Sequence, residues 1–230
     1  MQENIDQNSW KYKIAEQIVS SYKTDTMSKH IFENVIIKEL LWHATTMIKG
    51  YKVNRNGEID LEKEEMVQIK YIGQRYWSKK AIEKYKDDNP QGTNRWKTVT
   101  TGTLTHEHAV PRNMIREKIL KILASTAADS DEENKIGKVY EIIRKYSKAI
   151  IITQQEDKDL PKQNKNNFTK WETIDKEFGE VFQEEGEDFI DFIKKERYSK
   201  NIEIVDLCKH LDKNDIMPYD EKFKDIMHKI

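Results

Sequence analysis

The chain has 230 residues, and its 40 basic and 41 acidic residues nearly cancel, so any nucleic-acid binding requires a local patch of charge. The single cysteine, Cys208, excludes an intramolecular disulfide and a multi-cysteine zinc site, and it fits a reducing cytoplasm. No apolar run approaches the ~20 residues of a membrane span, and the polar start is unlike a signal peptide, so we expect a cytoplasmic protein without a membrane segment.

Helical spacing of apolar residues dominates the start of the chain. The pattern predicts one helix over 8–22 and a stronger one over 27–49, which Gly50 is expected to end. His43 lies beside the apolar stripe of the second helix, and we interpret it as a residue of the core or its boundary.

Turn and strand signals follow. Asn56-Gly57 predicts a hairpin turn between short strands at 51–53 and 58–60. A period-two pattern predicts another strand over 65–71, and Ser78 is expected to cap a helix over 79–87.

The middle of the chain alternates strands and helices. The predicted order is a strand over 98–104, a helix over 113–124, a helix from a Ser130–Glu133 capping box to Tyr146, a wholly apolar and therefore central strand over 149–152, and a short helix from a Thr153–Glu156 capping box to before Pro161.

The remaining patterns complete the fold class. They predict helices over 171–182 and 187–195, a strand over 202–205 and a helix over 218–228. The sequence therefore predicts an α+β protein, predominantly helical with a few short strands. We expect one domain over 1–230, with a helical N-terminal part at 1–50, a central part at about 97–160 and a helical C-terminal part at 171–230.

One stretch, Leu104–Asn113, concentrates chemically versatile residues. It holds two of the six histidines, His106 and His108, on either side of Glu107. Hydrolysis of a phosphodiester needs a base for the attacking water and a cation for the charge that develops on the phosphoryl group. A neutral imidazole suits the first task because its pKa lies near neutrality, and a carboxylate can hold the cation. Adjacent residues on a regular strand point to opposite faces, so Glu107 and His108 could face one site only if the strand is irregular. Pro111, three residues after His108, suggests that it is.

The run Glu107-His108-Ala109-Val110-Pro111 resembles the leading motif of the HNH, or ββα-metal, nucleases. The resemblance implies that Glu107 holds a metal ion and that His108 is the general base. It also implies a second strand and a helix, for which 150–153 and 154–160 are the candidates, with a helical insertion between the two halves. Glu156 would then be a further metal ligand, with Asp157 beside it. Three stretches taken together, 76–81, 106–108 and 151–157, resemble uncharacterised bacterial and phage proteins that carry an HNH-like signature.

Further residues extend this predicted site. His106 lies two residues from His108 on the same face of a strand, so it could bind the metal, or it could be an exposed strand residue. Arg112 could clamp a phosphate, or it could be a surface residue near a helix cap. Lys158 and Lys162 are candidates for binding nucleic acid. Mg²⁺ is the expected metal, with Mn²⁺, Zn²⁺ and Ni²⁺ as alternatives.

The resemblance predicts a metal-dependent nuclease that acts on DNA, or alternatively on RNA. A role in restriction or phage defence and a homodimeric state are further expectations. A rival pattern, Glu58-Ile59-Asp60 followed by Gln68-Ile69-Lys70, resembles a loose PD-(D/E)XK nuclease arrangement, which chance explains better in a chain rich in Lys and Glu. A different class is a non-enzymatic binding or regulatory protein with a degenerate nuclease fold. Convergence of Glu107, His108 and an acid from 153–160 would favour the enzyme. A buried salt bridge of Glu107, or a large distance between the two stretches, would favour the binding protein.

Overall fold

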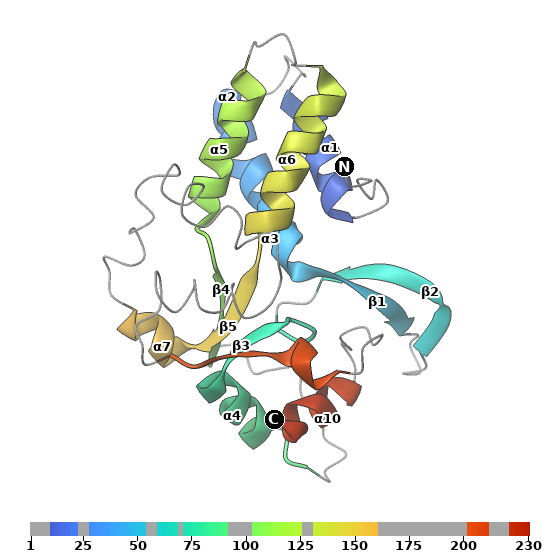
Figure 1. Cartoon of the computed structure of the whole chain (residues 1–230), viewed down its shortest axis with the longest axis vertical. Coiled ribbons are helices and arrows are strands. Elements are labelled where there is room, and N and C mark those ends of the chain that lie inside the picture. The colour runs from blue at the N-terminus through green and yellow to red at the C-terminus, as the bar shows by residue number, and fades with distance from the viewer. Residues whose placement is uncertain are drawn as a thin grey trace. The chain divides into compact units, whose positions relative to one another are not determined.

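A computed structural model describes residues 10–22, 28–53, 59–68, 71–91, 103–125, 131–160, 202–211 and 221–230. They form a mixed α+β fold in which helices dominate, which confirms the predicted class (Figure 1). Several predicted features lie outside the described residues: the helices over 171–182 and 187–195, Lys162, and most of the strand over 98–104. Within these ranges, no helix combines the length and the apolar character needed to cross a membrane.

The chain divides into two compact units, each built from segments that are distant in the sequence. Unit 1 holds Met1–Thr45, His108–Lys148 and Phe168–Gln183, and unit 2 holds the remaining segments, Thr46–Glu107, Ala149–Asn167 and Glu184–Ile230. The prediction of a single domain is not tested by this division and stays a prediction.

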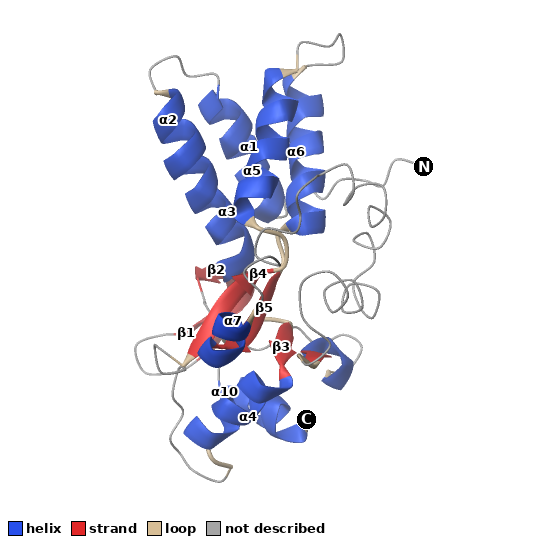
Figure 2. Ribbon diagram, turned by 90° about the vertical axis from the view of Figure 1, so that its left-hand side faces the viewer, coloured by secondary structure: helices blue, strands red, loops and turns tan. Residues whose placement is uncertain are grey.

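Unit 1 is helical, and its main helices lie side by side (Figure 2). Its elements are α1 (Trp10–Tyr22), α2 (Lys29–Ile31), the π-helical turn η1 (Phe32–Ile36), α3 (Ile37–Thr46), α5 (Arg112–Ala124) and α6 (Glu132–Tyr146). Helix α1 packs on α6 through an edge-on contact of Tyr12 with Tyr140, whose ring centroids are 5.5 Å apart. Helices α1, α3, α5 and α6 each bury one apolar face, as the helical spacing predicted.

The ends of two helices differ from the prediction. Helix α3 stops at Thr46 rather than at Gly50, because residues 47–53 pair as a strand instead. The predicted Ser130–Glu133 capping box is wrong by one residue, since the side chain of Asp131 accepts a 2.7 Å hydrogen bond from the backbone N–H of Asn134. An aspartate is as good an N-cap as a serine, so the local sequence offered two adjacent candidates.

Unit 2 contains a two-stranded hairpin. Strands β1 (Met47–Val53) and β2 (Ile59–Gln68) run antiparallel, from the pair Met47–Gln68 to the pair Val53–Ile59. The hairpin is confirmed, but it is longer than predicted. The two separate strands predicted at 58–60 and 65–71 are one strand, β2, because both continue the same ladder with β1.

The second sheet of unit 2 has the strand order β4-β5-β3-β6. Its elements are β3 (Tyr76–Ser78), α4 (Lys79–Asp88), β4 (Leu104–His108), β5 (Ala149–Thr153), α7 (Gln154–Asp159) and β6 (Ile204–Asp206). Strand β5 is an inner strand, as its wholly apolar sequence predicted. It runs parallel to β3, which runs antiparallel to β6. The chain then forms the short helix η2 (Leu207–His210) and ends in α10 (Glu221–Lys229).

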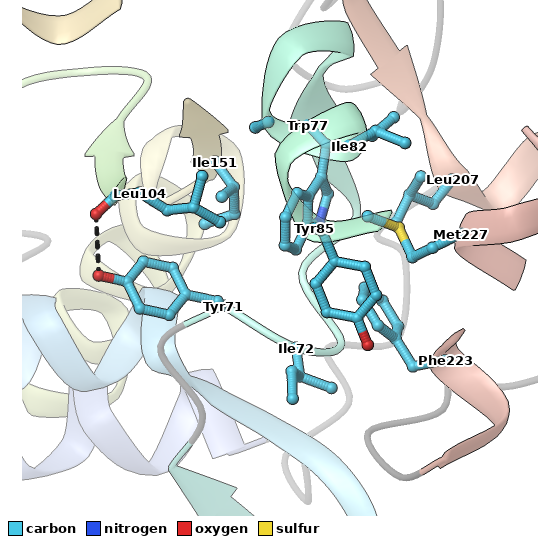
Figure 3. Packing of buried hydrophobic residues seen from close by; sticks show 11 residues of the cluster. Tyr71, Ile72, Trp77, Ile82, Tyr85, Leu104, Ile151, Leu207, Phe223 and Met227 are labelled. Atoms are coloured by element: carbon cyan, nitrogen blue, oxygen red, sulfur yellow. Dashed lines mark hydrogen bonds between the residues drawn. The ribbon is translucent and has the colours of Figure 1, made fainter. Parts of the chain in front are cut away.

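An aromatic cluster fills the core of unit 2 (Figure 3). Trp77 of β3, Tyr85 of α4 and Phe223 of α10 are each 0% exposed, and their ring centroids lie 5.6–5.9 Å apart. Tyr71 closes one side and donates a 3.0 Å hydrogen bond to the backbone oxygen of Leu104 in β4. This bond and the buried side chain of Leu104 fix the start of the strand that carries the predicted site.

Candidate functional site

Strand β4 carries the predicted site and is regular to its end. Its burial alternates, with Leu104, His106 and His108 buried and the two residues between them half-buried. His106 is 6% exposed and His108 is 9% exposed. The two histidines therefore share one face of the strand, as predicted. The alternative that His106 is an exposed strand residue is wrong, because this face is covered.

The regularity of β4 separates Glu107 from His108. The expectation that Pro111 disturbs the strand is wrong, because the bend begins only after His108 and Pro111 caps the N-terminus of α5 instead. Glu107 is half-buried on the face opposite to His106 and His108. The predicted metal ligand and the predicted base thus point away from each other.

The chain passes from unit 2 to unit 1 between Glu107 and His108. Within unit 1, the His108 ring lies 5.7 Å from the ring of Trp42 in α3, at an interplanar angle of 59°. Arg112 is the first residue of the following helix, α5, and its guanidinium carbon is 5.2 Å from the centroid of the same Trp42 ring. Arg112 also donates a 3.4 Å hydrogen bond from Nη1 to the backbone oxygen of Lys38. Arg112 is therefore half-buried and contacts two residues of the helix α3.

Strands β4 and β5 are neighbours, although two helices separate them in the sequence. The Gln154 N–H donates a 3.0 Å hydrogen bond to the backbone oxygen of Thr103, and the Ala109 N–H donates a 2.9 Å bond to that of Lys148. Residue numbers rise along one strand as they fall along the other, so the strands run antiparallel. The second bond also closes the base of the α5–α6 insertion, because the chain leaves and returns at adjacent points.

Glu156 is engaged in the protein's own structure. The predicted capping box is confirmed: the Glu156 carboxylate accepts bonds of 2.8 and 2.9 Å from the backbone N–H and the hydroxyl of Thr153. The same oxygen, Oε2, accepts a 2.7 Å bond from the hydroxyl of Ser78. Glu156 is 4% exposed. A carboxylate oxygen with three donors around it has little capacity left for a metal ion.

The three predicted ligands do not fit one metal ion. Glu107 and His106 project from opposite faces of β4. Glu156 lies near the other end of the strand pair, because Gln154 pairs with Thr103 and Glu107 is four residues, about 13 Å, further along β4. Among the described residues, no group of three His, Cys, Asp or Glu side chains could hold a metal.

The remaining predicted residues have different positions. Lys158 is exposed in the last turn of α7, and Asp157 is half-buried in its first turn. In the rival PD-(D/E)XK pattern, Asp60 and Gln68 lie on the single strand β2. Their partners on β1 are five residues apart, about 17 Å, so the two positions do not converge. Glu58 and Lys70 lie outside the described residues.

Two relationships at this site escaped the sequence analysis. Ser78 and Glu156 were each predicted in a cap, but nothing in the sequence indicated that they bond to each other. Trp42 was not identified as a neighbour of His108, because the residues are far apart in the chain. Trp42 follows Lys38 by four residues, so the two residues share a helix face. This spacing was a weak sign in the sequence that Trp42 belongs to the site. Comparison with known proteins finds no matching family model, curated protein or solved structure.

Proposed function

We propose that the chain is a nuclease that hydrolyses phosphodiester bonds in DNA, with RNA as the second possible substrate, and that His108 is its general base. The observation that carries this proposal is the pairing of β4, which ends in Glu107-His108, with β5, which leads directly into α7. The resemblance to ββα-metal nucleases requires two adjacent strands followed by a helix.

The closed base of the insertion supports the proposal. The bond between Ala109 and Lys148 lets α5 and α6 extend from the strand pair without separating the strands. The two halves of the resemblance, distant in sequence, therefore adjoin in the sheet. The resemblance does not require the halves to be close in sequence as long as the strands pair.

The chemical step assigned to His108 is proton transfer. His108 accepts a proton from the attacking water as the new phosphorus–oxygen bond forms, and the bond to the leaving oxygen breaks. Its place at the end of a strand and against Trp42 holds the imidazole on rigid elements. A divalent cation stays part of the proposal, with Mg²⁺ as the first candidate. Since the predicted ligands do not converge, we assign no step to the cation.

A second candidate function is non-enzymatic binding by a protein with a degenerate nuclease fold. Two observations favour it: Glu156 is occupied by Ser78 and Thr153, and Glu107 faces away from His108. In this case the strand pair and helix persist as a scaffold, and phosphodiester cleavage is absent.

Cleavage assays separate the two candidates. Plasmid DNA and total RNA are incubated with the protein and Mg²⁺, Mn²⁺, Zn²⁺, Ni²⁺ or EDTA. A general base contributes ~10²–10⁴-fold, so we expect His108→Ala to lose cleavage to that extent. His210→Ala is the matched control, because it removes an exposed imidazole that lies outside the proposed site. Absence of cleavage by the folded wild type with every metal would favour the binding protein.

A further inference from the structure

Two faces of unit 1 meet in a regular series of polar contacts. One face runs along η1 and α3, and the other runs from the end of β4 along α5. On the first face, Asn34, Lys38 and Trp42 follow at intervals of four residues and share a helix face. On the second, Arg112 and Arg116 share a face of α5, and His108 ends the strand that precedes it. We call these six residues the polar ladder: Asn34, Lys38 and Trp42 on the first face, and Arg116, Arg112 and His108 on the second.

The rungs of the polar ladder are direct contacts. Arg116 Nη1 donates a 2.9 Å hydrogen bond to Oδ1 of Asn34. Arg112 bonds to the backbone of Lys38 and stacks on Trp42, which in turn contacts His108. All six side chains are buried or half-buried. The ladder thus orders two guanidinium groups in a row that ends at His108.

Within the described part of the chain, the three positive charges along the ladder, Lys38, Arg112 and Arg116, form no ion pair. Two acidic residues adjacent in sequence to the first series contact other side chains: Glu33 lies 3.7 Å from Lys29 and Glu39 lies 3.5 Å from His43. The ladder is therefore a local basic strip in a chain whose total charge is close to zero.

The arginines also keep donors to spare. A guanidinium carries five N–H donors. The described residues provide an acceptor for Nη1 of Arg116 and none for its Nε. A guanidinium can offer two parallel N–H donors to one phosphate, whereas the ammonium group of lysine acts as a point charge.

We propose that the polar ladder binds the phosphodiester backbone of a nucleic acid and leads it to His108. The role of His108 in this inference rests on the proposed function, because His108 would act on the bound phosphodiester. Rungs one helical turn apart are separated by about 5.4 Å. A strand of duplex DNA carries one charge per ~3.4 Å of its axis, so neighbouring rungs meet phosphates one or two nucleotides apart.

Trp42 acts in this site as a positioning residue. Its ring lies 5.2 Å from the guanidinium carbon of Arg112, and this contact reduces the side-chain freedom that Arg112 would lose on binding. A lysine at position 112 would keep the charge but lose the bidentate donors.

The test measures binding without cleavage. Fluorescence anisotropy follows a fluorescein-labelled DNA duplex, and an RNA duplex of the same sequence, in EDTA over a series of salt concentrations. Each phosphate contact that is lost reduces the slope of log K against log salt by ~0.9. We expect Arg112→Ala and Arg116→Ala each to show this reduction and a several-fold loss of affinity. Lys121→Ala, which removes an exposed charge from α5, should leave both unchanged.

Trp42 provides a readout that general unfolding would not produce. Trp42→Phe should retain the wild-type salt slope, whereas Trp42→Ala should weaken binding as Arg112→Ala does. If Trp42→Ala does not fold, Arg112→Gln replaces it, because this variant removes the charge and keeps a polar side chain. A wild-type salt slope in the folded arginine variants would overturn the proposal, and so would a wild type that binds neither duplex.

The outcomes separate this inference from the proposed function. Ladder-dependent binding by a protein that never cleaves would support the ladder and contradict the nuclease. Cleavage by a protein whose folded ladder variants bind as the wild type does would support the nuclease and contradict the ladder. A lower melting temperature with an unchanged salt slope would assign the ladder to helix packing alone.

Discussion

The hydroxyl of Ser78 donates a 2.7 Å hydrogen bond to the carboxylate of Glu156 and thereby joins the starts of two helices. Ser78 caps α4, and Glu156 belongs to the capping box of α7. The helices begin side by side because β3 and β5 are parallel and each leads directly into a helix. The negative carboxylate also lies near the positive ends of both helices, which stabilises these ends. We therefore interpret Glu156 as a structural residue rather than a metal ligand.

A double-mutant cycle tests this junction. Ser78→Ala removes the N-cap of α4 and one donor to Glu156, and we expect a loss of about 1–3 kcal/mol in the free energy of unfolding. Glu156→Gln should cost a similar amount, because an amide replaces a charged acceptor. The losses should not add, with a coupling of about 0.5–3 kcal/mol in urea unfolding. Gln155→Ala, on the exposed side of α7, should change stability by no more than about 0.5 kcal/mol.

The pair Arg75–Asp206 should be a second determinant of stability. Its two bonds measure 2.8 and 2.7 Å, and the Asp206 side chain is 1% exposed. Burial opposes the charged form of Arg75, but the bonds to Asp206 outweigh it and raise the arginine pKa. Asp206→Asn should cost about 1.5–3 kcal/mol, because it weakens charge-assisted hydrogen bonds to the half-buried Arg75.

An exposed ion pair on neighbouring elements is the control for Asp206. Lys79 and Glu203 lie 3.4 Å apart with side chains 58% and 62% exposed. Glu203→Gln should cost no more than about 1 kcal/mol, because solvent screens the pair. Equal losses for the two variants in chemical unfolding would contradict the importance of burial.

Phe223 ties the C-terminal helix to the core of unit 2. It is 0% exposed and contacts both Trp77 and Tyr85. Phe223→Ala should reduce the free energy of unfolding by about 3–5 kcal/mol, through lost burial and the cavity that remains. Asp225→Ala, exposed on the same helix, should stay within about 0.5 kcal/mol of the wild type. Tryptophan fluorescence during unfolding would report both, since Trp77 adjoins Phe223.

Glu107 and Glu156 should differ in what their loss affects. If the nuclease proposal holds and Glu107 binds the cation, Glu107→Gln should raise the Mn²⁺ concentration for half-maximal cleavage about tenfold or more. Glu156→Gln should lower the unfolding midpoint and keep the metal dependence of any remaining cleavage. The reverse pattern in metal titrations and thermal melts would return Glu156 to the metal site.

The parts of the fold that sequence predicted depend on residues close together in the chain. The Thr153–Glu156 capping box spans three residues, and the apolar run of β5 requires burial on both faces wherever the strand lies. The Ser78 cap is local in the same way. Two predictions were wrong where the local signal was ambiguous. Asp131 and Ser130 are adjacent candidates for the same helix cap. A proline fits both an irregular strand and the start of a helix, and Pro111 lies at the start of α5.

The sequence by itself determined the class of fold, the inner strand β5, the caps of α4 and α7, and the single face shared by His106 and His108. Only the tertiary structure decided that β4 pairs with β5 across a helical insertion, that Ser78 bonds to Glu156, and that Trp42 stands between His108 and Arg112. The reason is physical. Caps and alternation arise within a few residues, whereas these contacts join residues whose proximity results from packing of the whole unit.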